Sequence, residues 1–162
     1  MDRAQTAIVA GVGRCLSDQG ARRSTMIDIA AAAGIAKGTL YNHVRTKSEA
    51  FVLYADAEVG RLSDALTTDG LEAAGAVVAE HPVVARMRRH EPAALAAALL
   101  SAQADAARGR VLEALDDLVG PSLAPVALRW LLSLALVPGN TASRAAEVVV
   151  LAGAAGAVTD RG

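Results

Sequence analysis

The sequence predicts an all-α protein in which a small N-terminal helix-turn-helix domain of three helices precedes a larger helical domain, with about nine helices in all. Hydrophobic residues make up 53% of the 162 residues and aromatic residues only 2%, and alanine, leucine and valine dominate, as is typical of helices. No alternation of apolar and polar residues persists long enough to indicate strands. A chain of this length can hold a head domain and a body, and we expect residues 1–46 and 47–162 to form them.

The charge distribution distinguishes the two expected domains. Residues 1–54 hold seven basic and four acidic side chains, a balance of +3, so the remainder must carry −4 to give the formal net charge of −1. Both lysines of the protein, Lys37 and Lys47, lie in this first segment. A basic head on an acidic body indicates a small DNA-binding domain attached to a domain with another role.

The first expected helix spans residues 3–19. Its apolar side chains recur at helical spacing, and Gly20 is a natural C-terminal stop. Residues 21–24 are expected to form a loop. Its two arginines, Arg22 and Arg23, leave two interpretations open, because they can be solvated surface residues or phosphate contacts.

Two short helices around a glycine turn follow. Thr25 is a good N-cap for the first of them, and Gly34 can take the left-handed conformation that ends it. The second helix spans residues 36–43 and is rich in hydrogen-bonding side chains. Thr46 and Glu49 form a capping-box pattern that opens the next helix. This arrangement is the outline of a helix-turn-helix DNA reader.

The run from Thr25 to Phe51 also carries a dense motif with regular spacing. Its members are Thr25, Ile29, Ala30, Ala33, Gly34, Lys37, Gly38, Thr39, Leu40, Tyr41, His43 and Lys47. This motif resembles the DNA-binding domain of the TetR-like transcriptional regulators, and the resemblance covers roughly the first third of the chain. It implies a homodimeric regulator whose partner is a double-stranded DNA operator. The remaining two thirds resemble that family only in their helical layout.

Polar and charged side chains of this segment are the predicted DNA contacts. The Thr25 hydroxyl at the start of a helix can meet a phosphate, and Gly38 removes a side chain where helix and groove approach most closely. Asn42 can reach base edges or phosphate. Ala36 stands where the family has a Ser or Thr cap, which costs about 1 kcal/mol of helix stability. The predicted contacts are Thr25, Lys37, Gly38, Thr39, Tyr41, Asn42, His43 and Lys47.

The rest of the chain is a series of helices separated by proline and glycine. Pro82, Pro92, Pro121 and Pro138 fall at the expected breaks, and proline suits the first turn of a helix. Between the breaks, apolar residues recur at the spacing of a helix face. The expected helices span residues 47–67, 71–80, 83–90, 93–119, 122–137 and 141–160.

The last two expected helices are apolar on too many sides for the surface of a monomer. Such surface usually marks a partner interface, and two antiparallel helices from each of two chains would bury it as a four-helix bundle. TetR-like proteins dimerise in this way, whereas burial within one subunit is the alternative. The predicted interface residues are Leu128, Leu131, Leu132, Val148, Leu151 and Gly153.

The resemblance further implies a cavity for a small, mainly apolar effector in the C-terminal ligand-binding and dimerisation domain. Occupation of this cavity would change the spacing of the two DNA-reading heads. The same apolar residues would equally make an ordinary core, so the cavity follows from the resemblance alone. The candidate lining residues are Leu62, Leu66, Met87, Leu99, Gln103 and Trp130.

Several other classes of protein find no support. The single cysteine, Cys15, excludes an intramolecular disulfide and a zinc site built from several cysteines. No catalytic-triad spacing, phosphate-binding glycine loop or metalloprotease motif occurs, so we expect no enzyme activity, metal or cofactor. No signal peptide or membrane-spanning segment is evident, so we expect a cytoplasmic protein that does not enter the membrane.

The sequence therefore predicts a DNA-binding transcriptional regulator, and more specifically a ligand-responsive repressor that binds a palindromic operator as a homodimer. One alternative is a helical interaction or small-molecule-binding module, also dimeric, that has lost DNA binding. Another is a helical bundle with enzymatic activity, although the sequence names no residues for it.

Overall fold

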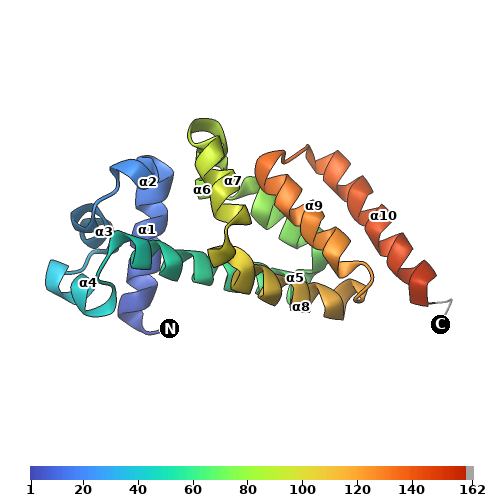
Figure 1. Ribbon diagram of the computed structural model, residues 1–162, viewed down its shortest axis with the longest axis horizontal. Helices are drawn as coiled ribbons and strands as arrows, with labels where there is room; N and C mark the ends of the chain where they lie inside the picture. Colours follow the sequence, from blue (N-terminus) through green and yellow to red (C-terminus); the bar gives the residue numbers. More distant parts are fainter. Residues whose placement is uncertain (160–162) are drawn as a thin grey trace. The chain divides into compact units, whose positions relative to one another are not determined.

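The computed structural model describes residues 1–159, without the side chains of residues 103 and 156–159. Ten α-helices and one 3₁₀ helix occur in this range and no strand does, so the predicted all-α fold class is confirmed. The chain divides into two compact units, Met1–Glu58 and Val59–Gly162. The long helix α5 (Lys47–Glu80) contributes residues to both units (Figure 1).

The first unit is built around the contact between its first helix and the helix that begins after Thr25. Besides the start of α5 it contains α1 (Arg3–Asp18), α2 (Gly20–Arg23), α3 (Met26–Ala33) and α4 (Lys37–His43). Ile8 and Val12 on α1 are fully buried. A Cβ atom on Gly11 would lie 2.7 Å from the backbone nitrogen of Ala33 on α3, so only glycine allows this approach. The contact explains a glycine that weakens α1 by roughly 1 kcal/mol relative to alanine.

The structure corrects the loop expected at residues 21–24, because residues 20–23 form a single helical turn, α2. Gly20 starts the turn with φ +81°. The hydroxyl of Ser24 donates to the carbonyl of Gly20 at 2.7 Å, and the Lys47 ammonium donates to the carbonyl of Ala21 at 3.1 Å. The Gly20 carbonyl also accepts from the Ser24 amide, whereas the Ala21 carbonyl, which a short helix leaves free, is satisfied by a residue distant in the sequence.

Helix α5 combines the two helices expected at residues 47–67 and 71–80. It is not continuous in conformation, because Gly70 has φ +83° and ψ −171° inside it. Positive φ is accessible to glycine at little cost, so the bend lies where the sequence interrupts the helix. At its start, the amide of Glu49 donates to the hydroxyl of Thr46 at 3.1 Å, as the capping pattern predicts.

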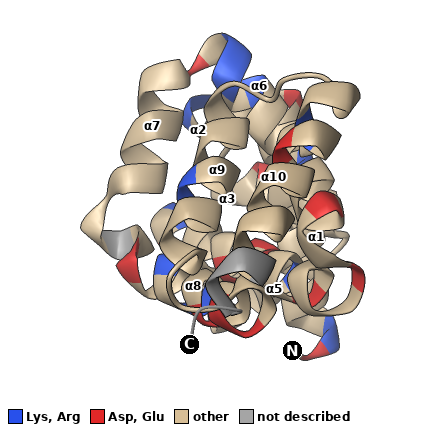
Figure 2. Cartoon of the chain, turned by 90° about the vertical axis from the view of Figure 1, so that its right-hand side faces the viewer, with Lys and Arg blue, Asp and Glu red and all other residues tan. Residues whose placement is uncertain are grey.

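The second unit has a core shared by the C-terminal part of α5, α8 and α9. After α5 come α6 (Pro82–His90), α7 (Pro92–Leu100), η1 (Ala102–Ala104), α8 (Asp105–Val119), α9 (Ala124–Leu136) and α10 (Thr141–Thr159). Leu66 and Leu115 are fully buried in this core. The Trp130 ring packs so closely on α5 that a Cβ atom on Gly75 would lie 2.5 Å from it. The indole N–H donates to Glu147 on α10 at 2.6 Å. Figure 2 shows α7 and α9 with almost no charged residues.

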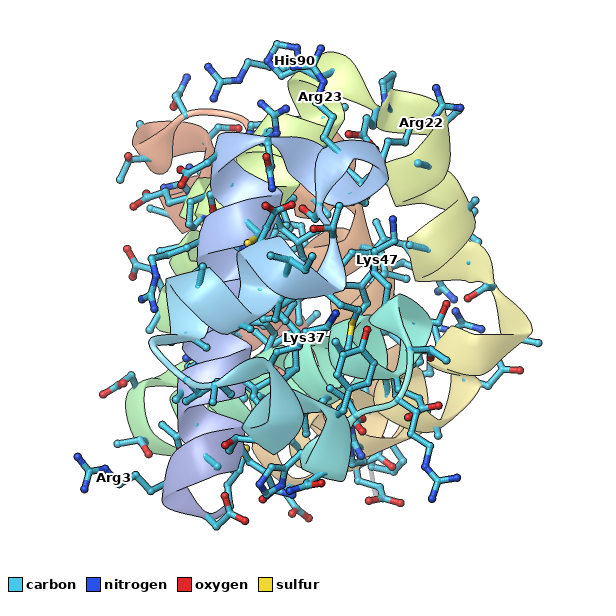
Figure 3. All side chains as sticks on the ribbon, turned by 90° about the vertical axis from the view of Figure 1, so that its left-hand side faces the viewer. Arg3, Arg22, Arg23, Lys37, Lys47 and His90 are labelled. Carbon is cyan, nitrogen blue, oxygen red and sulfur yellow. The ribbon has the colours of Figure 1, made fainter. Side chains whose placement is uncertain are left out.

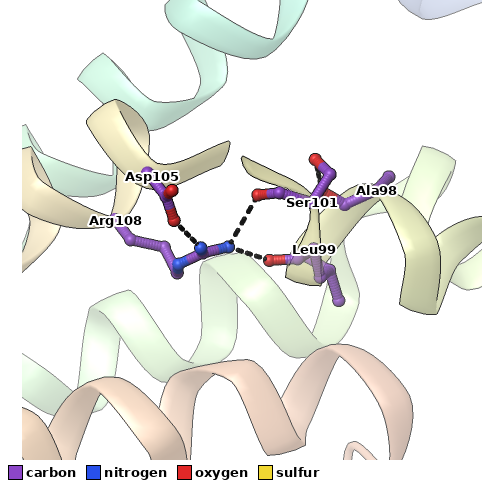
Figure 4. Close-up of polar contacts among 5 residues, drawn as sticks. All are labelled: Ala98, Leu99, Ser101, Asp105 and Arg108. Atoms are coloured by element: carbon purple, nitrogen blue, oxygen red, sulfur yellow. Dashed lines mark hydrogen bonds and ion pairs between the residues drawn. The ribbon is translucent and has the colours of Figure 1, made fainter. Parts of the chain in front are cut away.

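The single helix predicted for residues 93–119 is wrong. The chain leaves the helical conformation at Ser101, which has ψ 156°, and passes through η1 before α8 begins. The Arg108 guanidinium holds this break: it donates to the carbonyl of Leu99 at 2.6 Å, to the carbonyl of Ser101 at 3.3 Å, and to the carboxylate of Asp105 (Figure 4). The break carries neither proline nor glycine, so local sequence could not predict it.

Two glycines of α5 should respond oppositely to alanine. Gly75→Ala should lower the free energy of unfolding by roughly 1–3 kcal/mol, because the new methyl group overpacks against Trp130. Gly60→Ala, where a Cβ atom meets nothing within 4 Å, should raise it by up to about 1 kcal/mol through helix propensity. Urea unfolding followed by the fluorescence of Trp130, the one tryptophan, measures both. Equal effects of the two substitutions would show that the Gly75–Trp130 contact is not a constraint.

Candidate nucleic-acid interface

The turn between α3 and α4 has the geometry expected of a helix-turn-helix. Gly34 has φ +66°, and its amide donates to the carbonyls of Ala30 and Ala31. Ile29 on α3 and Leu40 on α4 are both fully buried, so the apolar core holds the two helices in place beside the turn. Apart from the half-buried Thr39, the other residues of α4 are exposed.

Most of the predicted contacts on α4 are exposed. Lys37, Gly38 and Asn42 are exposed, Tyr41 is 40% exposed and Thr39 is half-buried. The Lys37 ammonium lies 5.7 Å from the centroid of the Tyr41 ring, which is within the range of a cation–π contact. The structure therefore brings these residues together on one short helix, with a positive charge held against an aromatic ring.

Gly38 is not required by the packing of the chain. A Cβ atom built on it meets no atom within 4 Å, and its helical position does not need a left-handed backbone. Glycine in a helix interior costs roughly 1 kcal/mol relative to alanine. No packing contact offsets this cost at Gly38. A glycine on the exposed side of α4 therefore suits a surface that another molecule approaches closely.

The hydroxyl of Thr25 is committed to the start of α3. It donates to the Asp28 carboxylate at 2.7 Å and accepts from the Asp28 amide at 3.2 Å, while the Thr25 amide donates to the same carboxylate at 2.9 Å. The Thr25 hydroxyl, with the Thr25 amide, holds the pKa of Asp28 below its ordinary value of 3.8. Thr25 thus orients α3, and a phosphate would share its hydroxyl with this cap.

Two further predicted contacts are engaged within the first unit. His43 ends α4, and its Nδ1 lies 4.0 Å from the carboxylate of Asp2, the residue that caps α1. The Gln5 amide is the main cause that lowers the pKa of Asp2, and His43 adds to it. The half-buried Lys47 donates to the Ala21 carbonyl, and its ammonium lies 5.9 Å from the Phe51 ring centroid. His43 therefore connects α4 to the start of α1, and Lys47 connects α5 to α2.

For Arg22 and Arg23 the sequence left two interpretations open, solvated surface residues or phosphate contacts, and they were not in the list of predicted DNA contacts. Both are exposed at the end of α2, and neither makes a hydrogen bond or ion pair among the described residues. In Figure 3 they lie at the top and upper right, above Lys47 and Lys37, whereas Arg3 lies at the lower left. The signal in the sequence was their position just before the Thr25 cap.

The candidate effector-pocket residues are found at different depths of the second unit. Leu66 is fully buried in the core, and Leu62 and Trp130 pack against that core. Met87 and Leu99 are half-buried, and the Gln103 side chain lies outside the described residues. Within the range described, no group of three or more His, Cys, Asp or Glu residues could hold a metal ion.

The candidate dimer residues also differ in exposure. Leu131 is only 3% exposed and belongs to the core of the second unit, against which Leu128, Val148 and Leu151 pack. Leu132 is half-buried and Gly153 is exposed. Large apolar side chains that do face outward lie nearby: Val137 is 74% exposed, Val149 70% and Val150 71%. No helix among the described residues is long and apolar enough to cross a membrane.

Residues 8–52 match a family of proteins described as "Bacterial regulatory proteins, tetR family". The matched segment includes most of α1, all of α2, α3 and α4, and the first turns of α5. Comparisons with curated proteins and with solved structures find no match.

The missing cap of α4 is a local weakness that a single substitution can repair. Ala36 has an extended backbone, φ −65° and ψ 147°, and no side chain caps the amides of α4. Ala36→Ser should raise the free energy of unfolding by about 1 kcal/mol, because serine can accept a hydrogen bond from one of these amides. The control Ala31→Ser, on the exposed surface inside α3, should give a small decrease. Urea unfolding measures both, and a stability that Ala36→Ser leaves unchanged would contradict the assignment of the cap.

The Thr25–Asp28 box should make stability depend on pH. Because the folded pKa of Asp28 lies below 3.8, its contribution is present above that value and is lost as the pH falls through the lowered pKa. Asp28→Ala should therefore destabilise the protein at pH 7, and the difference from the parent should shrink toward pH 3. The control Asp64→Ala removes an exposed carboxylate that bonds to no described residue. A parent–Asp28→Ala difference that stays constant in urea unfolding across this pH range would refute the box.

Proposed function

We propose that this chain, whose residues 8–52 form the DNA-binding domain of the bacterial tetR family of regulatory proteins, is a ligand-responsive repressor that binds a palindromic operator as a homodimer. The family match supports a DNA-binding transcriptional regulator. The observation that carries the proposal is the exposed polar side of α4, supported from beneath by the fully buried Leu40.

DNA recognition would divide between charge and hydrogen bonding. Lys37 supplies positive charge at the start of α4, where contact with phosphate strengthens binding to any sequence. The Tyr41 hydroxyl and the Asn42 amide are free to donate and accept hydrogen bonds at base edges in the major groove. Gly38 leaves the space that such an approach needs.

A homodimer would supply the second DNA-reading head. The exposed valines of the C-terminal region, Val137, Val149 and Val150, support a partner interface because apolar surface of this kind is stabilised by burial. Gly153 on α10 would permit close approach of a second helix. Two symmetry-related heads would then match two half-sites separated by about one helical turn of DNA, ~34 Å, or a multiple of it.

An effector would act through the second unit and α5. The half-buried Leu62, Met87 and Leu99 supply apolar side chains for a small apolar molecule. Because α5 carries residues of both units, a ligand that favours one arrangement of this helix would change the population of heads spaced to bind DNA. The effector would thereby weaken operator binding.

Substitution of Gly38 separates DNA binding from stability. Gly38→Ala should stabilise α4 by up to about 1 kcal/mol, yet weaken binding to DNA by roughly tenfold or more, because a methyl group obstructs the close approach. Binding is measured by fluorescence anisotropy on a labelled duplex selected by the parent protein from a random-sequence library.

The matched control is Gly60→Ala, which removes another unconstrained helical glycine at a distance in sequence from α4. It should stabilise the protein similarly and leave DNA affinity unchanged. If the parent selects no duplex and shows no salt-sensitive binding to DNA, the chain is an interaction module that has lost DNA binding. If Gly38→Ala binds as tightly as the parent, α4 does not enter the groove in the proposed way.

A further inference from the structure

The one-turn helix α2 is unusually well fixed for so short an element. Ser24 is 1% exposed, and both its hydroxyl and its amide donate to the carbonyl of Gly20, at 2.7 and 3.2 Å. Gly20 itself takes the positive φ of 81° that lets the chain turn out of α1. An isolated turn of four residues is not stable in water, so these contacts and the tertiary contact of Lys47 hold it.

Lys47 joins this turn to α5. Its ammonium donates to the Ala21 carbonyl at 3.1 Å, and its side chain is half-buried against Phe51. Lys47 is the first residue of α5, whose start is itself fixed because the amide of Arg45 donates to the Glu49 carboxylate at 2.8 Å. Through the bond to the Ala21 carbonyl, the lysine fixes the turn α2, which carries Arg22 and Arg23, relative to the start of α5.

The residues held in this way are arginines without partners. Arg22 and Arg23 are exposed and make no hydrogen bond or ion pair with any described residue. Residues 20–47 contain five basic side chains and one acidic side chain, Asp28, whose carboxylate is occupied by Thr25. In Figure 3 Arg23 and Arg22 lie at the top and upper right, with Lys47 below them and Lys37 near the centre. Because the one carboxylate of residues 20–47 is already engaged, nothing in this segment neutralises the two guanidinium groups.

We propose that Arg22 and Arg23 bind DNA phosphates, and that Lys47 acts mainly as a positioning residue that holds their turn through the Ala21 carbonyl. The proposal rests on the proposed DNA-binding function and adds a phosphate contact outside α3 and α4. Guanidinium groups suit this role because they bind phosphate through two parallel N–H donors. The free ends of both side chains are available, whereas the Lys47 ammonium already has a partner within the domain.

Salt dependence tests the phosphate contact. Each phosphate neutralised on duplex DNA contributes about 0.9 to the slope of log K against log salt concentration. In a homodimer the double variant Arg22→Gln/Arg23→Gln removes two arginines from each of the two heads. It should therefore lower that slope by about 3.6, or about 1.8 per subunit, and weaken binding to the selected duplex and to an unrelated duplex by the same factor. The control Arg3→Gln removes an exposed arginine at the opposite end of the unit (Figure 3) and should leave the slope unchanged. An unchanged slope in the double variant overturns the contact.

A double-mutant cycle tests the positioning role. Lys47→Met should weaken DNA binding when the arginines are present, and should have little further effect in the Arg22→Gln/Arg23→Gln background, because the element that it positions is gone. Additive losses, with a further decrease in slope on loss of Lys47, would mean that the ammonium contacts phosphate itself and would overturn the positioning role.

A second variant avoids dependence on the folding of Lys47→Met. Ser24→Ala removes a hydroxyl that is too buried to touch DNA, yet it loosens the same turn. It should weaken binding only while the arginines are present, and an equal loss in both backgrounds overturns the role of the turn. The parent must bind DNA throughout, so a parent that does not bind refutes the proposed function, whereas a parent that binds with an unchanged slope in the arginine variant refutes this inference alone.

Discussion

The first unit depends on the close approach of α1 and α3 at Gly11. With a backbone nitrogen of Ala33 only 2.7 Å from where a Cβ atom would lie, any larger residue would separate the two helices. Their approach lets Ile8 and Ile29 be fully buried although the unit has few aromatic side chains to fill space. Because Leu40 of α4 is as fully buried as Ile8 and Ile29, the close packing of α1 on α3 also constrains the position of α4.

In the second unit a glycine also permits a close helix contact, but there a large aromatic side chain rather than a backbone fills the space beside it. Trp130 occupies the space that Gly75 leaves on α5, and its indole N–H is bonded to Glu147 on α10. The C-terminal half of α5 is therefore held by α9 and α10 together. In a chain so rich in alanine, helix packing is determined by a few positions where glycine permits contact and one aromatic ring fills the gap.

Sequence-based reasoning succeeded where structure is determined by neighbours along the chain. The Thr25 cap, the Gly34 stop and the breaks before Pro82 and Pro92 are all local, and the structure has them. It failed at Ser101, because the break there is stabilised by Arg108 from the next helix rather than by a breaker residue. For the same reason it did not predict the turn α2, whose carbonyls are satisfied partly from α5.

In the candidate DNA-binding site, too, the sequence predicted what depends on local spacing but not what depends on contacts between distant residues. Exposure of Lys37, Tyr41 and Asn42 followed from the burial of Leu40, since helical spacing determines which side chains lie opposite a core residue. Which polar groups are already engaged did not follow from spacing. The hydroxyl of Thr25 and the ammonium of Lys47 have partners inside the unit.

Motif matching treats all these positions as equivalent contacts, but a hydrogen bond within the protein must be shared or broken before the same atoms bind DNA. The groups without partners therefore have the greater effect on DNA affinity, and the engaged groups contribute by orienting them.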